Sequence, residues 1–190
     1  MRNDLKTELA GALGLETPPA PCAIQAAFND YVRKMCPITV ETPLPETISF
    51  LDENFPHLVK LETRLPGSEV WVNAKWPRVS DALKRGIFDD TDYRCDPRRV
   101  SALSGVAHLL RSPHRIHPNL RHGDRKLGNI RGEHIYVREH AKNQVWVAFT
   151  LKDDRMGITV VTSSFYTRPQ WLHECAGMPA AFERDRKSRQ

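Results

Sequence analysis

The sequence predicts an α+β fold in which helices precede a small antiparallel β-meander. Up to residue 111, apolar residues recur at helical spacing between prolines, whereas beyond Gly132 they alternate with a period of two, as in strands. The connections between the later segments are short, which forces antiparallel pairing. The helices are therefore expected to cover one face of the sheet.

Residues 1–44 are predicted to form a helical appendage. A short helix is expected over 3–13, and a stiff, proline-rich connector follows over 17–21. A second helix is expected over 22–34, because the apolar residues of that segment share one face. Prolines 37, 43 and 45 then predict an extended linker.

The main domain is predicted to span residues 45–175. Residues 47–51 and 55–61 are expected to form one broken helix or two short ones, with Asn54 capping the second. A short strand is expected over 69–72, and helices are expected over 77–88 and 96–111. Asp96 is the expected N-cap of the last helix, which Ser112 and Pro113 stop.

Three strands are predicted after Gly132, over 134–139, 145–151 and 158–165. The polar loop 153–157 ends in Gly157, where a hairpin needs a positive φ. In the first strand, Tyr136 and Arg138 should face away from Ile135 and Val137. The basic tail, 176–190, is expected to be disordered.

Charge divides the chain into two parts. The net formal charge is +5, but residues 1–110 hold 13 Lys and Arg against 15 Asp and Glu, whereas residues 111–190 hold 15 against 8. A basic segment of this kind can hold a phosphate backbone, although a solvated basic face is the alternative. The four cysteines are scattered and form no recognisable zinc-binding pattern. The sequence also shows no secretory signal and no membrane-spanning segment. We therefore expect a cytoplasmic protein with no membrane partner, and delivery into a target cell would leave no mark on the sequence.

The residue types suit metal-independent cleavage of RNA. When the 2′-hydroxyl is the nucleophile, the reaction needs a base, an acid and cations, which histidine and arginine supply. His57 and Lys60 would be neighbours on one helix face, although a solvated pair is the alternative. Phosphate clamps are expected on a loop that carries Arg121, His122, Arg125, Lys126 and Arg131.

The sheet supplies a third candidate cluster. Tyr136 and Arg138 share a face, and the last strand carries the hydroxyls of Thr162 and Ser163, which could orient a phosphate. Trp146 or Tyr136 could stack a base, although core packing is an equal explanation for Trp146.

Several segments together resemble the phage-associated domains of the barnase–EndoU–colicin–RelE-like nuclease superfamily. The resemblance covers residues 45–170 and rests on short motifs: FPHLVKL at 55–61, LLRSPHRI at 109–116, YVR at 136–138, VAF at 147–149 and VTSSF at 161–165. It implies a barnase/RelE-like meander and a metal-independent ribonuclease, often a toxin or a phage-borne effector, with RNA and an immunity or antitoxin protein as partners and no cofactor.

The resemblance also implies roles for individual residues. His57 would be general base or acid, Lys60 and Arg138 would stabilise the phosphoryl oxygens, and the hydroxyls of Tyr136, Thr162 and Ser163 would orient the scissile phosphate. One departure from the family pattern is that barnase-like enzymes use a carboxylate as base. The predicted strands offer only Glu133 and Glu139, which flank the first one.

Two other functions compete with this hypothesis. The first is a non-catalytic nucleic-acid-binding or phage accessory protein, which needs the basic loop but not His57 or Thr162. The second is a metal enzyme with His114, His117 and His122 as ligands, although no companion carboxylate stands at a regular spacing.

Overall fold

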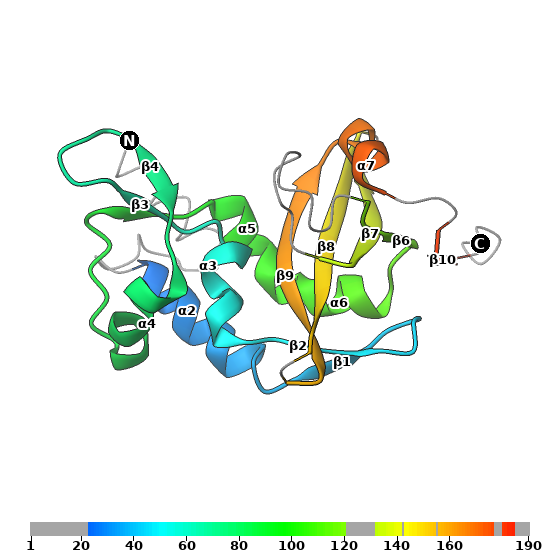
Figure 1. The fold of residues 1–190 in the computed structure, drawn as a ribbon, viewed down its shortest axis with the longest axis horizontal. Coiled ribbons are helices and arrows are strands. Elements are labelled where there is room, and N and C mark those ends of the chain that lie inside the picture. Colours follow the sequence, from blue (N-terminus) through cyan, green and yellow to red (C-terminus); the bar gives the residue numbers. More distant parts are fainter. Residues whose placement is uncertain (1–22, 121–131, 142, 155, 177–179, 185–190) are drawn as a thin grey trace. The chain divides into compact units, whose positions relative to one another are not determined.

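The computed structural model describes residues 23–120, 132–141, 143–154, 156–176 and 180–184 (Figure 1). The chain forms two compact units, each built from two stretches of sequence. The first takes residues 1–37 and 51–104, and the second takes 38–50 and 105–190. Helices occur together with two sheets whose strand pairs are antiparallel, except for that between β2 (Thr47–Ser49) and β9 (Ile158–Thr167), which confirms the general α+β class. No helix in the described ranges is long and apolar enough to cross a membrane.

The first unit packs short helices beside a small three-stranded sheet. Its aromatic core contains Phe28, Tyr31 and Phe55. The rings of Phe28 and Phe55 meet edge to face, with their centroids 5.2 Å apart. The sheet order is β4-β3-β5, and all pairs are antiparallel. The elements are α2 (Ala23–Lys34), η1 (Asp52–Asn54), α3 (Phe55–Leu58), β3 (Glu62–Arg64), β4 (Trp71–Asn73), α4 (Trp76–Arg85), β5 (Tyr93–Arg94), α5 (Pro97–Ala102) and η2 (Leu103–Gly105), the last ending in the second unit.

The helix expected over 3–13 lies outside the described residues. The helices expected over 22–34, 55–61, 77–88 and 96–111 are present as α2, α3, α4 and α5, and the last three are shorter than expected. The helix expected over 96–111 is interrupted by η2, so that only α5 belongs to the first unit. Asp96 caps α5 as predicted, because its side chain accepts a hydrogen bond from the Arg98 amide. Asn54 stands at the N-cap of α3 but makes no capping hydrogen bond, so that prediction is wrong.

The second unit is a curled seven-stranded sheet with the order β1-β2-β9-β8-β7-β6-β10. The three predicted strands are present and pair in sequence, antiparallel, as β7, β8 and β9. Gly157 adopts the expected positive φ of 65° in the turn before β9. The elements are β1 (Thr39–Glu41), β2 (Thr47–Ser49), α6 (Val106–Arg111), β6 (Arg115–Pro118), β7 (His134–Ala141), β8 (Gln144–Asp153), β9 (Ile158–Thr167), α7 (Pro169–Cys175) and β10 (Phe182–Glu183).

Residues 38–50 are part of this sheet, contrary to expectation. The segment 47–51 was expected to be helical, but Thr47–Ser49 is strand β2. It pairs antiparallel with β1 and parallel with β9, where Ile48 lies opposite Thr159. The sheet is therefore not purely antiparallel. The domain boundary expected at residue 44 falls inside this segment, which the pairing with β9 holds in the second unit.

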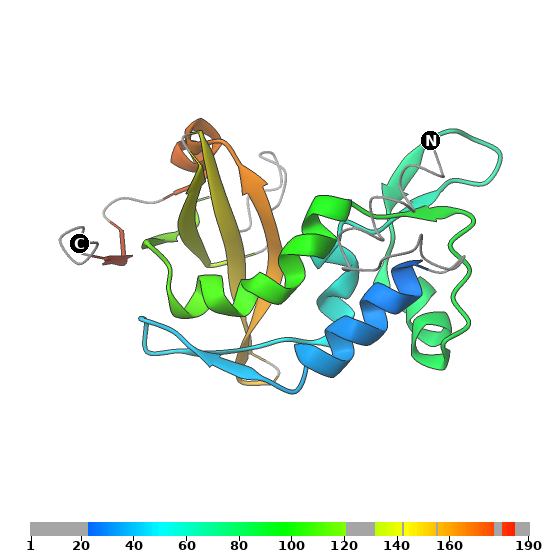
Figure 2. The same ribbon diagram turned by 180° about the vertical axis from the view of Figure 1, so that it is seen from behind.

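The two faces of the sheet are covered by different helices. One face carries a core in which α7 packs on β7 and β8, and its buried members include Ile135, Val137, Val147, Phe149 and Leu172. The other face carries α6, which packs against β1, β7 and β8 and crosses the long strands in Figure 2. Tyr136 and Arg138 lie on this second face, because side chains alternate along a strand.

Candidate active site

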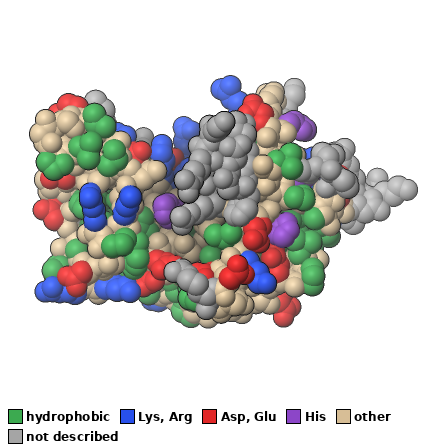
Figure 3. Space-filling view, in the orientation of Figure 1, with side chains coloured by type: hydrophobic (Ala, Val, Ile, Leu, Met, Phe, Trp, Pro, Cys, Tyr) green, Lys and Arg blue, Asp and Glu red, His purple; other side chains and the backbone are tan. Residues whose placement is uncertain are grey.

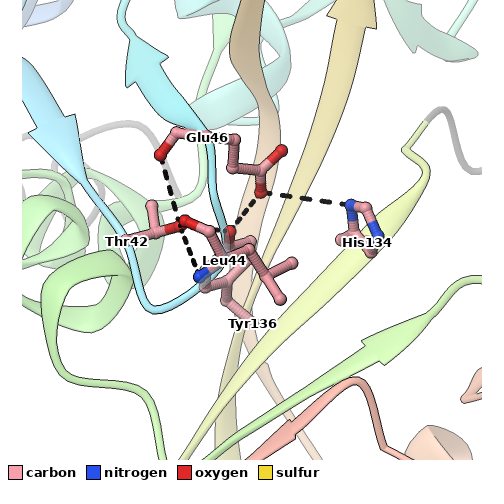
Figure 4. A network of polar contacts seen from close by, with 5 residues as sticks. All are labelled: Thr42, Leu44, Glu46, His134 and Tyr136. Carbon is pink, nitrogen blue, oxygen red and sulfur yellow. Dashed lines mark hydrogen bonds and ion pairs between the residues drawn. The ribbon is translucent and has the colours of Figure 1, made fainter.

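A polar network joins the β1–β2 connection to β7 on the face that α6 covers (Figure 4). The Tyr136 hydroxyl donates a hydrogen bond to the carboxylate of Glu46 and lies 3.1 Å from the Thr42 hydroxyl oxygen. The imidazole of His134, two residues before Tyr136, has Nδ1 4.0 Å from the same Glu46 oxygen. The network therefore brings a carboxylate and an imidazole together on one face of the sheet.

The chain holds Glu46 in place through its own connection. The Thr42 hydroxyl donates to the Leu44 carbonyl at 3.1 Å and accepts from the Leu44 amide at 3.2 Å. The Glu46 amide in turn donates to the Leu44 carbonyl at 2.7 Å. Pro43 and Pro45 restrict φ at two of the three positions between Thr42 and Glu46. This rigid turn presents the Glu46 side chain to Tyr136.

Tyr136 positions the carboxylate and does not face solvent. Its side chain is completely buried. Burial, together with the hydrogen bond to Glu46, raises the pKa of its hydroxyl far above the ordinary value. The hydroxyl thus stays protonated at neutral pH and donates to Glu46. Tyr136 was expected to orient a phosphate, but a buried phenol can only act through Glu46.

Glu46 and His134 are the accessible members of the network. The Glu46 side chain keeps 18% of its area exposed and the His134 side chain keeps 31%. In Figure 4 the second carboxylate oxygen of Glu46 points away from Tyr136 and His134. A partly exposed carboxylate beside a partly exposed imidazole can take a proton from one group and give a proton to another. Figure 3 shows histidine and acidic side chains next to each other on the surface of the second unit.

The basic segment 121–131, which Asn119 and Gly132 flank, ends close to His134 in the sequence. Asn119 is buried and donates its side-chain amide to the Gly132 carbonyl at 2.7 Å, while its backbone amide donates to Glu133. These bonds tie together the two ends of the segment that begins after Leu120 and ends just before Gly132. His134 follows two residues later, at the start of β7.

A buried hydroxyl lies beside His134 on the neighbouring strand. Thr150 is directly opposite His134 in the β7–β8 register, so both side chains are on the same face. The Thr150 hydroxyl is fully buried and finds no hydrogen-bond partner among the described residues.

The predicted proton-transfer residues belong to the first unit. His57 is exposed in α3, and its backbone carbonyl accepts from the Arg99 guanidinium at 3.3 Å. Lys60 lies beyond the end of α3, with a positive φ of 52°, so the two side chains are not one helical turn apart as expected. The helix stops because the Leu61 amide turns back to the Pro56 carbonyl at 2.7 Å. His57 and Lys60 therefore do not share a compact unit with the predicted sheet residues.

The predicted sheet residues do not all gather at one point. Arg138 lies on the Tyr136 face, where its guanidinium donates to the Ser112 carbonyl at 2.7 Å. Ser163 is opposite Phe149 and so belongs to the other face. Thr162 lies at the β-bulge and donates its hydroxyl to the Phe149 carbonyl at 3.3 Å. The structure thus separates Ser163 from Tyr136 and Arg138.

The five predicted phosphate-binding residues, Arg121, His122, Arg125, Lys126 and Arg131, lie outside the described residues. His122, one of the three candidate metal ligands, is therefore also outside them. Within the described ranges, no group of three or more His, Cys, Asp and Glu side chains could hold a metal ion.

Sequence reasoning missed both Glu46 and His134 as site residues. Glu46 stood in a proline-rich segment that was interpreted as a linker, and His134 was assigned only to the start of a strand. The one available signal was the rigidity of that linker, because two prolines around a turn fix the direction of the next side chain.

Comparison with protein-family models, with curated proteins and with solved structures gives no match to this chain.

Proposed function

We propose that the protein is a metal-independent ribonuclease in which Glu46 and His134 perform the proton transfers. The observation that carries the proposal is the pair itself: two proton-transfer groups of different chemistry, both accessible, held 4.0 Å apart by a network that fixes one of them. A surface ion pair formed by chance would lack the buried Tyr136 beneath it.

The pair can carry out a balanced reaction. The Glu46 carboxylate removes the proton from a ribose 2′-hydroxyl, and the 2′-oxygen forms a bond to phosphorus. The bond between phosphorus and the 5′-oxygen breaks, and the His134 imidazolium gives its proton to that leaving oxygen. The products are a 2′,3′-cyclic phosphate and a free 5′-hydroxyl, and no metal or cofactor takes part.

The remaining residues take supporting roles in this proposal. The basic side chains of residues 121–131 would stabilise the extra phosphoryl charge, because Asn119 and Gly132, which flank them in the sequence, are hydrogen-bonded to each other two residues before His134. Tyr136 would keep Glu46 in one orientation. Glu46 also supplies a carboxylate on the Tyr136 face of the sheet, which removes the main departure from the barnase-like pattern and supports a barnase/RelE-like meander in β7–β9.

The test is cleavage of labelled RNA in EDTA by wild type, Glu46→Gln and His134→Gln. We expect wild type to leave 2′,3′-cyclic ends and each variant to be about a hundredfold slower or more, since a positioned acid or base contributes roughly 10²–10⁴-fold. Glu183→Gln and His173→Gln are the matched controls, because both side chains are exposed and lie on other elements of the same unit. Wild type that leaves every RNA intact would refute the proposal.

Nucleic-acid binding without cleavage is the competing function, favoured by the charge of segment 121–131. It predicts tight RNA binding that Glu46→Gln leaves unchanged. Replacing Arg121, Arg125 and Lys126 by Ala would weaken binding and flatten its dependence on salt, because each lost phosphate contact lowers the slope by about one.

A further inference from the structure

We propose that His140 and Tyr166 form a stacking platform for an unpaired base of the RNA that Glu46 and His134 cleave. This inference rests on the proposed function for its class of substrate. It assigns a second binding site, on the same face of the sheet, to residues that the acid–base chemistry does not use.

Three rings form a ladder across the end of β7, β8 and β9. The Trp146 ring stacks on Tyr166 with centroids 5.5 Å apart and planes at 29°. The His140 ring lies 4.7 Å from Tyr166 at 49°. Trp146 is directly opposite Arg138 on one side and Tyr166 on the other, so these side chains share the face that carries Tyr136.

The three rings differ in exposure: Trp146 is buried, whereas His140 and Tyr166 are exposed or partly exposed. Trp146 is 8% exposed, its indole N–H donates to the Ser164 hydroxyl at 2.9 Å, and Gly105 lies directly against its ring. His140 is exposed and Tyr166 is partly exposed. Trp146 and the buried Tyr136 were the residues expected to stack a base, but neither presents an open ring face. The platform consists of the exposed His140 ring and the partly exposed Tyr166 ring, which contact each other.

The charge around the platform suits a polyanion with unpaired bases. Arg138 lies opposite Trp146 on the same face of the sheet. Its planar guanidinium has five N–H donors, one of which bonds to the Ser112 carbonyl. The nearest carboxylate on β7, Glu139, faces the opposite side and lies 3.7 Å from Arg115. Partial burial raises the pKa of Tyr166, so its ring stays neutral. Aromatic rings beside cations are the common arrangement for binding single strands.

The platform lies within a few nucleotides of the proposed cleavage site. Arg138, opposite Trp146, is four residues along β7 from His134, or about 13 Å at roughly 3.3 Å per residue. Because α6 covers the part of this face between the two positions, a single strand that meets both sites passes beside α6. The base on the platform is therefore a neighbour of the scissile phosphate and not the base attached to it.

The experiment measures the affinity for a short RNA made uncleavable by a 2′-deoxy nucleotide at the scissile position. One abasic nucleotide is moved along the strand, and dissociation constants are compared for wild type, Tyr166→Leu, Tyr166→Phe and His140→Ala. At one position we expect the abasic RNA to bind wild type about 5- to 100-fold more weakly, the range that stacking of one base gives. Tyr166→Leu should bind intact and abasic RNA equally, whereas Tyr166→Phe should retain the preference.

A purely structural role for the ring would lower the affinity for intact and abasic RNA by the same factor, and that result would overturn the proposal. So would wild type that is insensitive to an abasic nucleotide at every position while it still cleaves RNA. Conversely, an abasic penalty that disappears in Tyr166→Leu supports the platform even where cleavage fails, so the two proposals can fail separately. His173→Ala, an exposed histidine on α7, should retain the full abasic penalty.

Discussion

The hydroxyl of Tyr136 donates to the carboxylate of Glu46, a residue 90 positions earlier in the chain. The donor is buried on the central part of the sheet and the acceptor is partly exposed at its edge connection. A neutral donor beneath a carboxylate fixes its orientation without neutralising its charge. Tyr136, a buried residue of the sheet, therefore fixes the Glu46 member of the Glu46–His134 pair.

Tyr136→Phe should separate this positioning role from packing. The ring stays and the hydroxyl is lost, so we expect the free energy of unfolding to fall by about 1 kcal/mol. We expect kcat on RNA to fall about tenfold at an unchanged KM, because Glu46 loses its orientation but the binding surface is intact. Urea unfolding and steady-state kinetics measure both effects. Tyr93→Phe, in the first unit, is the control, and an unchanged kcat in Tyr136→Phe would argue against positioning.

Lys60 gives a direct test of where α3 ends. Its φ of 52° is a conformation that glycine adopts without strain, so Lys60→Gly should raise the free energy of unfolding by up to about 1 kcal/mol. In a helix that continued through residue 61, the same change would lower it by a similar amount. Lys60→Ala removes the charge and keeps the Cβ atom. It should change stability little, because the ion pair with Glu62 is long, at 3.9 Å, and its Lys60 side chain is exposed.

Gly105 is required by the packing of Trp146. A Cβ atom at position 105 would come 2.4 Å from the far edge of the indole ring, so Gly105→Ala forces the ring or α6 to move. We expect the free energy of unfolding to fall by about 1–3 kcal/mol, with a change in tryptophan fluorescence. Ser104→Ala, at the exposed preceding position, should stay within about 0.5 kcal/mol of wild type. Equal stabilities for the two variants would contradict the close approach.

The buried thiol of Cys95 predicts a loss of stability at alkaline pH. Burial, and then the charges of Asp96 and Asp90, raise the pKa of this thiol from 9.0 to about 12. Above pH 9 the unfolded chain releases a proton that the folded chain keeps. The free energy of unfolding should therefore fall as the pH rises, by up to about 1.4 kcal/mol per pH unit between pH 9 and 12.

Urea unfolding from pH 7 to 11 measures this slope. Cys95→Ala should show a shallower decline above pH 9. The part that remains should come from Cys36, whose pKa is raised to about 11, and from Tyr31 and Tyr136, whose pKa values burial also raises. Parallel curves for Cys95→Ala and wild type would mean that the thiol ionises equally in both states.

The parts of the fold that local sequence determines were predictable. The strands β7, β8 and β9 were found because alternation and turn residues are read within each segment. The segment that forms β2 was not, because its short apolar run suits a helix or a strand equally. Its conformation is decided by Thr159 and its neighbours in β9, more than a hundred residues later. Long-range pairing of this kind leaves no periodic pattern.

The candidate site was predicted less completely than the fold, for the same physical reason. The residue types were expected, and Arg138 was assigned to the correct face. The pairing of Glu46 with His134 depends on how the sheet curls to bring its edge connection to β7, which the spacing of residues does not encode. The prediction that His57 and Lys60 lie one helical turn apart was wrong, because Lys60 adopts a left-handed backbone conformation. That conformation is not expected for a lysine from sequence alone.

The most direct test of the Glu46–His134 proposal is the pH dependence of single-turnover RNA cleavage in EDTA. Wild type should give a bell-shaped profile, because the reaction needs an ionised Glu46 and a protonated His134. Glu46→Gln should lose the acidic limb and His134→Gln the alkaline limb, and the maximal rate of each variant should be lower than that of wild type by about a hundredfold or more. A Glu46→Gln profile that coincides with that of wild type would contradict the assignment of Glu46 as the base.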